Sequence, residues 1–287
     1  MTPPAYSTAS AFRQALEARL HSMAQGHSAD IQRMRRQVAF DRFLCRIFQC
    51  SGEYWLLKGG YAMELRLRES RTTRDIDLAV RRAIDGSGPL QNRMLHRLQA
   101  AASMDLKDFF VFAVGRPSQD LANVPYGGAR FPVQARMAGR TFSRFHLDVA
   151  AGEPVLEPIE IVQGGDWLAF AGIPADGFPS ISKEQQFAEK LHAYTLPRTD
   201  RPNTRVRDLL DMLLLVRAGM RNDLLLEAVR IVFARRNTHP VPIALPSPPV
   251  SWTNPFAAMA GECGIDADVN EVLRVVAAYL SKKNVLA

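Results

Sequence analysis

The sequence has no run of 18 or more apolar residues, so we expect no helix of this chain to span a bilayer. Cysteine is scarce too: there are three, none in the spacing of a metal site, which suits a reducing compartment. Residues 1–28 mix Arg, Glu and His with apolar residues and lack the apolar core of a signal peptide. These absences predict a cytoplasmic protein that has no membrane partner.

The signatures of several common enzyme classes are missing as well. The chain contains no Gly-x-x-x-x-Gly-Lys-[Ser/Thr] loop, no Gly-x-Gly-x-x-Gly turn, no His-Glu-x-x-His pair and no Gly-x-Ser-x-Gly elbow. The sequence therefore argues against a P-loop NTPase, a Rossmann dehydrogenase, a zincin protease and an α/β-hydrolase.

Acidic residues are outnumbered: 29 Asp and Glu stand against 36 Lys and Arg, which gives a formal net charge of +7. A surface of this charge favours polyanions. Two groups of arginines concentrate it. The first, interpreted either as a solvated helix face or as an anion-binding surface, consists of Arg33, Arg35, Arg36, Arg42 and Arg46. The second, in and just after a proline-punctuated loop, consists of Arg198, Arg201, Arg205 and Arg207.

The order of predicted elements indicates an α+β fold. Helical spacing extends over residues 10–49, as two helices separated near residues 26–28, and again over 61–68 and 90–102. Strand patterns occupy residues 54–57, 74–80, 109–114, 130–137 and 144–150. Strands mixed with helices, without a regular βαβ repeat, predict a mixed β-sheet domain flanked by N-terminal helices over residues 1–180.

From residue 182 the pattern is helical. Helices are expected at residues 182–197, 204–218, 222–235 and 267–282, and the first begins with a Ser-x-x-Gln capping box. The stretch 238–255 contains six prolines and is expected to be a linker or an extended segment. Residues 181–287 are therefore predicted to form a C-terminal helical domain.

Two acids define the strongest candidate site. Asp75 and Asp77 are two residues apart in a predicted strand, so their carboxylates lie on one face, with Cα atoms roughly 6.5–7 Å apart. Ile76 and Leu78 then point into the core. Mg²⁺ prefers carboxylate oxygens and bridges them to substrate phosphates, so this pair predicts a metal site.

A glycine pair lies just upstream of the acids. Gly59 and Gly60 separate a predicted strand from a predicted helix, where backbone N–H groups and the helix dipole favour an anion. Strand, Gly-Gly, helix and Asp-x-Asp strand follow one another in this order. That order predicts a phosphate cradle beside a metal site, as nucleotidyl transfer requires.

A third carboxylate is predicted on a neighbouring strand. Asp148 lies within the apolar strand 144–150, where an acid needs a partner. It is interpreted either as a third metal ligand or as an acid paired with one of the many arginines.

Four motifs in order resemble those of the AbiEii/MenT-type nucleotidyltransferase toxins, within the DNA polymerase β-like superfamily. The first two are Leu57-Lys58-Gly59-Gly60-Tyr61-Ala62 and Arg71-Thr72-Thr73-Arg74-Asp75-Ile76-Asp77-Leu78. The others are Glu189-Lys190-Leu191-His192-Ala193 and Arg205-Val206-Arg207-Asp208-Leu209-Leu210-Asp211. The family usually writes Arg-x-Lys-Asp in the fourth motif, where this chain has Arg207 in place of the lysine.

The resemblance implies a set of site residues. Asp75, Asp77, Lys190 and Asp208 would be catalytic, with Asp211 as the alternative functional acid of the fourth motif. The expected nucleotide-binding residues are Lys58, Gly59, Gly60, Arg71 and Thr73. The expected metal ligands are Asp75, Asp77 and Asp148, holding Mg²⁺ or Mn²⁺, with an NTP as substrate.

The sequence and the resemblance together predict an enzyme that transfers NMP from an NTP to an RNA 3′ end, with the tRNA acceptor stem as the expected RNA. Arg198, Arg201 and Arg205 are expected to bind that RNA. By resemblance, the enzyme is the toxin of a toxin–antitoxin pair and has a cognate antitoxin protein. The alternatives are nucleotide transfer to a protein or a small molecule, and a non-catalytic nucleic-acid-binding module. In some members of the family a hydroxyl two residues before the first aspartate is phosphorylated, which makes Thr73 the expected position here.

Overall fold

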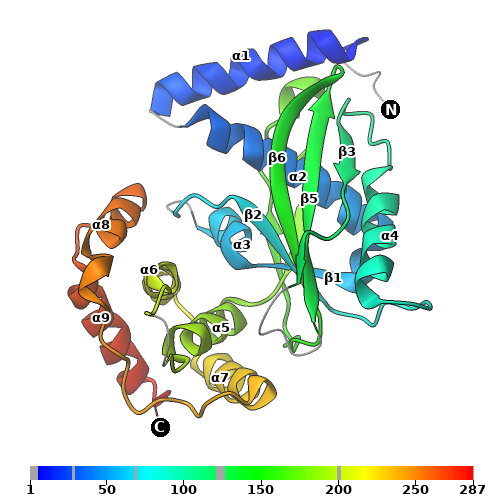
Figure 1. The fold of residues 1–287 in the computed structure, drawn as a ribbon. Helices are drawn as coiled ribbons and strands as arrows, with labels where there is room; N and C mark the ends of the chain where they lie inside the picture. The colour runs from blue at the N-terminus through cyan, green and yellow to red at the C-terminus, as the bar shows by residue number, and fades with distance from the viewer. Residues whose placement is uncertain (1–5, 28–29, 68–69, 121–126, 199–201, 287) are drawn as a thin grey trace. The chain divides into compact units, whose positions relative to one another are not determined.

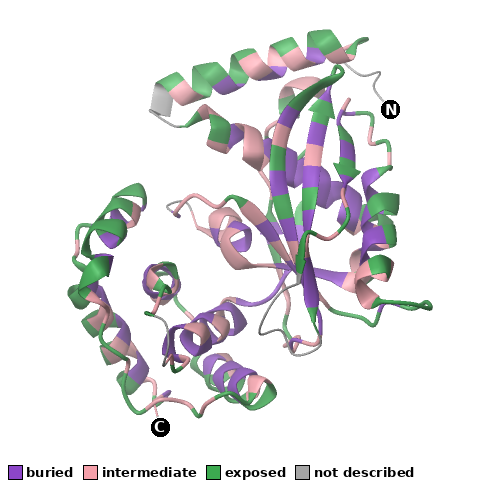
Figure 2. Cartoon of the chain, in the orientation of Figure 1, coloured by how far each residue is buried: buried purple, intermediate pink, exposed green. Residues whose placement is uncertain are grey.

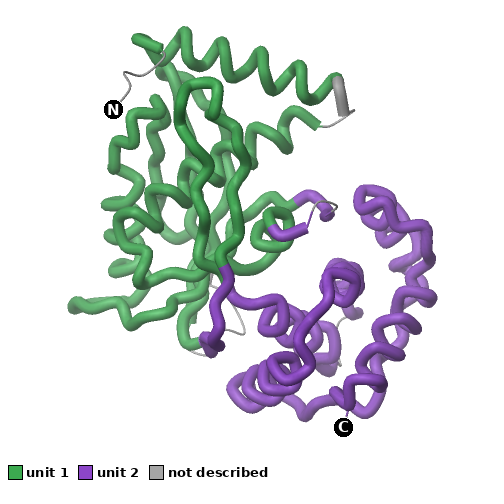
Figure 3. The backbone as a smooth tube through the Cα atoms, turned by 180° about the vertical axis from the view of Figure 1, so that it is seen from behind, with its two compact units in different colours: residues 1–65, 73–152, 161–180 green, residues 66–72, 153–160, 181–287 purple. Residues whose placement is uncertain are grey.

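The computed structural model describes residues 6–27, 30–67, 70–120, 127–198 and 202–286. These residues form two compact units, coloured separately in Figure 3. Unit 1 comprises residues 1–65, 73–152 and 161–180, and unit 2 comprises residues 66–72, 153–160 and 181–287. The sequence predicts two domains that meet at residue 180, and that boundary stays a prediction. Two short segments before it, 66–72 and 153–160, are grouped with unit 2.

Unit 1 is a mixed sheet with helices, as the sequence predicts (Figure 1). Its helices are α1 (Ala9–His27), α2 (Ile31–Ser51), α3 (Gly59–Arg66, whose last residue belongs to unit 2) and α4 (Leu90–Ala102), with short 3₁₀ turns at Gly52–Tyr54 and Ala169–Ala171. Its strands are β1 (Trp55–Lys58), β2 (Asp75–Val80), β3 (Val111–Val114), β4 (Gln119–Asp120), β5 (Gly128–Met137), β6 (Arg140–Ala150), β7 (Glu160–Gln163, whose first residue belongs to unit 2) and β8 (Gly177–Ser180).

The sheet joins parallel and antiparallel strands. Within the described chain its order is β3-β5-β6-β2-β1-β8-β7, and β4 pairs with β5. Strand β2 lies parallel to β6 and antiparallel to β1, so it is central. This register puts Asp77 opposite both Lys58 of β1 and Asp148 of β6.

The alternation of β5 and β6 separates a core face from an open face. Along β5 the residues Ala129, Phe131, Val133, Ala135 and Met137 are buried, whereas those between them are more exposed (Figure 2). The buried face packs against α2 and α4 (Figure 1). The candidate site residues of β2 and β6 therefore stand on the opposite face, because side chains two apart point the same way.

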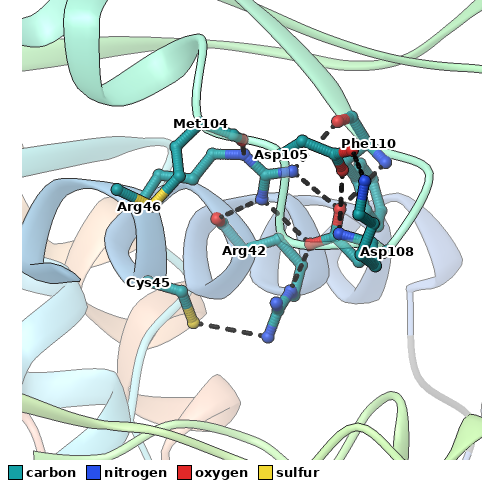
Figure 4. A network of polar contacts seen from close by, with 8 residues as sticks. Arg42, Cys45, Arg46, Met104, Asp105, Asp108 and Phe110 are labelled. Atoms are coloured by element: carbon teal, nitrogen blue, oxygen red, sulfur yellow. Dashed lines mark hydrogen bonds and ion pairs between the residues drawn. The ribbon is translucent and has the colours of Figure 1, made fainter. Parts of the chain in front are cut away.

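Helix α2 changes the interpretation of the first arginine group. Arg42 and Arg46 are buried and share Asp108, with Arg42 Nε 2.7 Å from Oδ2 and Arg46 Nη2 2.7 Å from Oδ1 (Figure 4). Burial alone would raise the pKa of Asp108, but the two guanidinium groups hold it below its ordinary value. The expectation of a solvated or anion-binding face is therefore wrong for these two. They anchor the loop that leads into β3.

Unit 2 is built mainly of helices. They are α5 (Lys183–Thr195), α6 (Val206–Ala218), α7 (Asn222–Arg236), α8 (Thr253–Glu262) and α9 (Val269–Lys282), with a 3₁₀ turn at Val250–Trp252. The predicted capping box begins α5, where Ser182 Oγ accepts from Gln185 N. Helix α6 ends at Ala218 and is capped by the positive-φ Gly219.

Some short elements were missed. The predicted linker 238–255 is wrong at its end, where α8 begins at Thr253 and contains Pro255 in its first turn. Proline is tolerated there because the first helical N–H groups have no intrahelical partner. Strands β4, β7 and β8, of four residues or fewer, were also missed.

No helix among the described residues is long and apolar enough to cross a membrane.

Candidate active site

Gly59 and Asp77 are packed directly together. The glycine pair follows β1, as the sequence predicts, but helix α3 begins at Gly59 itself, two residues before the predicted start, and Gly59 has φ +67°. A Cβ built on this residue would lie 2.1 Å from Asp77 Oδ2 and 2.8 Å from Asp77 Cβ. Only glycine fits both the backbone conformation and this contact. The glycine turn and the acidic strand thus form one local unit.

Helix α3 is fixed to α2 by several polar contacts of Tyr61 and Glu64. The Tyr61 hydroxyl donates to the buried carboxylate of Asp41, and Arg33 binds Glu64 at 2.6 Å. Asp41 also accepts from Gly165 N and Trp167 Nε1, at 2.7 and 2.9 Å. These contacts hold the start of α3, and with it the glycine pair, in one position against the sheet.

The two acids of β2 lie on one face, as predicted. Asp75 and Asp77 are half-buried, whereas Ile76 and Leu78 between and after them are fully buried. Their carboxylates therefore share the open side of the sheet with the neighbouring residues of β6.

Asp148 is next to them but is held by an arginine. It is the register partner of Asp77 on β6. Arg130 of β5 binds both of its oxygens, with Nε–Oδ1 and Nη2–Oδ2 at 2.7 Å. The same Nη2 is 3.6 Å from Asp75 Oδ2. The bond to Asp148, followed by the charges of the three acids, raises the pKa of Arg130.

His146 completes this row of β6. It is the register partner of Asp75, and its Nδ1 lies 3.4 Å from Asp75 Oδ1. With a side chain 48% exposed, His146 presents its ring to solvent beside the acidic pair.

The donor set fits a divalent cation at two of its three carboxylates. Asp75 and Asp77 are hard oxygen donors on one face, and Mg²⁺ commonly takes one or two carboxylates and completes its coordination with water and phosphate. Both oxygens of Asp148 accept hydrogen bonds from Arg130. Among the described residues, no group of three or more His, Cys, Asp or Glu is arranged to hold a metal. Each oxygen of Asp148 keeps a lone pair for a cation, but Arg130 places its own positive charge beside that position.

Unit 2 contains a second charged cluster, formed by Lys190 of α5, Asp208 and Asp211 of α6, and Arg71. Lys190 Nζ is 2.5 Å from Asp211 Oδ2 and 3.3 Å from Asp208 Oδ1. Arg71 binds both oxygens of Asp211, at 2.9 and 2.8 Å. The cluster therefore balances two cations with two carboxylates.

Asp211 is the centre of this cluster. Its side chain is 1% exposed, against 14% for Asp208. Burial would raise the pKa of Asp211, but Lys190 and Arg71 hold it below the ordinary value. Burial would likewise lower the pKa of Lys190, but Asp211 and Asp208 hold it above the ordinary value. Both groups remain charged at neutral pH.

The remaining nucleotide-binding candidates lie around the β1–α3 turn and the start of β2. Lys58 and Gly60 are half-buried beside Gly59. Strand β2 begins at Asp75, so strand alternation does not extend back to Thr73. The Thr73 hydroxyl donates instead to Asp75 O at 3.4 Å. This places the hydroxyl close in sequence to the acids without fixing its direction relative to them.

The predicted RNA-binding arginines differ from one another. Arg198 donates to Leu196 O and Ala193 O, both at 3.0 Å, and so satisfies carbonyls at the end of α5. Burial and the nearby Arg205 lower the pKa of Arg198. Arg205 is exposed and lies 3.7 Å from Asp208 Oδ2. Arg201 lies outside the described residues.

Sequence reasoning missed Arg130 and His146. Both alternate with buried residues in β5 and β6, so their face could be predicted from period two. Their pairing with Asp148 and Asp75 depends on strand order, which no local pattern contains.

The fold of this chain is similar to that of a toxin of known structure. MenT4, a nucleotidyltransferase toxin from Mycobacterium tuberculosis H37Rv, matches with a TM-score of 0.55 and 17% identity over 94% of this chain and 99% of that chain. JHP933 from Helicobacter pylori matches with a TM-score of 0.46 and 14% identity over 87% of this chain and 95% of that chain. No curated protein sequence matches the chain.

A sequence model described as nucleotidyl transferase AbiEii toxin, type IV toxin–antitoxin system, matches residues 42–274, most of the chain. The match includes all four motifs from which the resemblance was inferred. The chain therefore belongs to the AbiEii family of nucleotidyltransferase toxins.

Proposed function

We propose that this toxin transfers NMP from an NTP to the 3′ end of an RNA, with the tRNA acceptor stem as substrate. The observation that carries the proposal is the packing of Gly59 against Asp77, which joins an anion-binding turn to a carboxylate pair suited to a divalent cation. Membership of a nucleotidyltransferase family supports an NTP as the substrate and a divalent metal as the cofactor. Mg²⁺ is the proposed ion, with Mn²⁺ as a substitute.

In the proposed reaction the RNA 3′-hydroxyl attacks the α-phosphorus, and the bond from that phosphorus to the bridging oxygen of pyrophosphate breaks. Asp75 and Asp77 would hold the cation, which would favour deprotonation of the hydroxyl and neutralise charge on the triphosphate. The amides of Gly59 and Gly60 would orient the phosphates at the start of α3. Lys58, Arg71 and Thr73 are the other proposed nucleotide-binding residues.

Lys190 and Asp208 enter the proposal through the family resemblance. Lys190 would stabilise the charge that develops on the leaving pyrophosphate. Its support is that Asp211 and Asp208 keep it protonated in spite of burial. The same contacts join α5 to α6, so a purely structural Lys190 would affect stability and not the chemical step.

The experiment incubates the full chain with total RNA and each labelled NTP in turn, with Mg²⁺ or EDTA. We expect one NTP to label the RNA 3′ end only with Mg²⁺, and Asp75→Asn or Asp77→Asn to abolish labelling in a protein of unchanged circular dichroism. Label on protein or on a small molecule, or wild-type labelling by either variant, would overturn the proposal. An RNA that binds without being labelled under any condition would favour a non-catalytic module.

The family also implies an antitoxin partner for this toxin. We infer that Thr73 is the residue through which an antitoxin could control transfer, since it lies two residues before Asp75.

A further inference from the structure

The open face of the unit 1 sheet contains a groove that ends at Asp75. It is a cavity of about 820 Å³, here called the acceptor groove, and its lining includes Arg36, Arg74, Asp75, Gln134, Arg144 and His146. These residues come from α2, from β2 and the residue before it, from β5 and from β6. Gly59, Gly60 and Asp77 are not part of its lining. The groove therefore meets the acidic pair at Asp75, away from the glycine turn.

The three arginines of the groove differ from the other arginines of α2 in their partners. Arg33 binds Glu64 and Arg35 binds Glu17, each at 2.6 Å. Arg36 instead has its nearest carboxylate, on Asp30, at 4.0 Å. Its Nε is buried without a hydrogen-bond partner in the described structure. A buried N–H of this kind needs an acceptor, and the groove is the cavity on which Arg36 opens.

The other two arginines of the groove are Arg74 and Arg144. Within the described chain, neither Arg74 nor Arg144 forms a hydrogen bond or an ion pair through its side chain, and both are exposed. Most partly buried arginines of unit 1 are matched with carboxylates, as Arg130 is with Asp148. The groove thus gathers three guanidinium groups with unused donors around one carboxylate. Phosphates at several positions are the ligands that this arrangement fits.

The remaining wall suits nucleotides rather than isolated phosphate. His146 exposes its ring next to Asp75, and Gln134, the register partner of Arg144, lines the same groove while its Nε2 donates to Thr141 Oγ1 at 2.8 Å. A ring on an open sheet is a surface on which a base can stack, beside cations that follow the backbone. Because His146 lies beside Asp75, the base that stacks on its ring would belong to the nucleotide nearest the acidic pair.

We propose that the acceptor groove binds the single-stranded 3′ end of the RNA, with its last hydroxyl at Asp75. This inference rests on the proposed function and names the surface that holds its acceptor. Arg36, Arg74 and Arg144 bind successive phosphates, and His146 stacks on the terminal base. It assigns the RNA end to unit 1, whereas the sequence predicted RNA contacts at Arg198, Arg201 and Arg205.

The test compares two full-length variants of equal charge. The groove variant is Arg36→Gln, Arg74→Gln and Arg144→Gln. The control variant is Arg82→Gln, Arg116→Gln and Arg217→Gln, three exposed arginines outside the groove. The probe is a fluorescein-labelled RNA hairpin with a single-stranded 3′ overhang, titrated by anisotropy without NTP at several salt concentrations. Both variants are checked for a wild-type melting temperature.

We expect the groove variant to bind the hairpin at least tenfold more weakly. Each lost phosphate contact should reduce the slope of log K against log salt by about 0.7, so the slope should fall by about 2. The control variant should bind within about twofold of wild type, and shortening the overhang should abolish the difference between the two variants. If Arg36→Gln lowers the melting temperature, the Arg74→Gln, Arg144→Gln double variant replaces the triple, with an expected fall of about 1.4 in slope.

Three results would overturn the inference. One is a groove variant with the wild-type Kd and slope while wild type labels RNA, which leaves the proposed function intact. Another is a loss equal to that of the control variant. The third is loss of affinity for a glutamate-rich peptide but not for RNA, which would make the groove a protein-docking surface. If wild type neither binds nor extends RNA, the proposed function fails, and this inference fails with it.

Discussion

Gly59 leaves no room for a side chain beside Asp77: an added Cβ would meet both the Oδ2 and the Cβ of that residue. Rotation of the carboxylate alone therefore would not relieve the contact, and the φ of +67° adds strain for any other residue. We expect Gly59→Ala to displace Asp77 and to lower NMP transfer about 100-fold or more, the scale of losing one preorganised stabilising group. The measurement is transfer to RNA under single-turnover conditions.

Gly172→Ala is the matched control for this substitution. Gly172 has φ +72°, but nothing lies within 4 Å of a Cβ built there. It should share the backbone strain of Gly59→Ala, with a loss of about 1 kcal/mol in stability, and keep its transfer rate. Equal losses of transfer in both variants would show that strain alone, and not the position of Asp77, explains the effect.

Arg130 is expected to oppose cation binding. Its guanidinium holds Asp148 and lies 3.6 Å from Asp75, so it places a positive charge where the ion would approach. Arg130→Gln should therefore tighten Mn²⁺ binding about tenfold. The expected gain is modest because the Arg130 side chain is about a third exposed, so solvent screens part of its repulsion of the ion. Electron paramagnetic resonance of free Mn²⁺, without nucleotide, measures this directly.

The same variant tests Asp148 as a third ligand. In the Arg130→Gln background, Asp148→Asn should weaken Mn²⁺ binding again if the released carboxylate contacts the ion. If it has no effect on Mn²⁺ affinity, Asp148 serves only as the partner of Arg130. Unchanged affinity in Arg130→Gln itself would contradict the first expectation.

How far the sequence predicts this molecule differs between elements. Helix α2 and strands β2, β5 and β6 have a clear apolar period, so the sequence alone predicts whether each is a helix or a strand and which of its faces is buried. Pairing across the sheet is not local: the strand order β5-β6-β2 places Asp148 beside Asp77 and brings Arg130 to Asp148 and Asp75. The burial of Arg46 was missed because its partner Asp108 is 62 residues away.

Lys190 is predicted to have a stabilising role that can be separated from catalysis. Lys190→Met leaves the buried Asp211 with Arg71 and Asp208 with only the exposed Arg205 at 3.7 Å, so it should lower the free energy of unfolding by about 3 kcal/mol, the usual loss for breaking a buried ion pair. Adding Asp208→Asn restores the charge balance and should recover part of that loss. Urea unfolding measures both.

Transfer should not recover in the Lys190→Met, Asp208→Asn double variant if Lys190 acts on phosphate. A turnover that returns together with stability would instead make the cluster structural. RNA affinity should be similar in wild type and in both variants, because the effect of Lys190 is expected on the transition state.

Modification at Thr73 should silence the enzyme. A phosphate there adds about −1.5 to −2 charge close in sequence to Asp75 and competes with the incoming triphosphate. Thr73→Glu should abolish most transfer, whereas Thr73→Val should keep much of it, since the hydroxyl makes only the long hydrogen bond to Asp75 O. Thr72→Glu is the neighbouring control and should be milder. Full activity of a folded Thr73→Glu variant would end this hypothesis.

Between pH 7 and 4.5 the two units should respond to acid in opposite directions, because a buried histidine of unit 2 has a lowered pKa and a buried carboxyl of unit 1 has a raised pKa. In unit 2, Arg236 can only donate to His192 Nδ1, so Nε2 carries the proton and donates to Thr238 Oγ1 at 2.8 Å. Burial, with the charges of Arg236 and His239, lowers the pKa of His192 to about 3. In unit 1, burial raises the pKa of Asp41 to about 6 in spite of three donors.

The sign of each effect follows from which state binds the proton. Below pH 6.5 the unfolded chain protonates His192 and the folded chain does not, so this contribution to stability falls by about 1.4 kcal/mol per pH unit down to about pH 3. Between about pH 6 and 3.8 the folded chain protonates Asp41 and the unfolded chain does not, so stability rises as pH falls. Hydrogen exchange from pH 7 to 4.5, corrected for the intrinsic rate, should show protection falling in α5 and α7 and holding or rising in α2 and α3. His192→Leu should flatten the first trend and Asp41→Asn the second; a trend that survives its own substitution would assign the acid response to other groups.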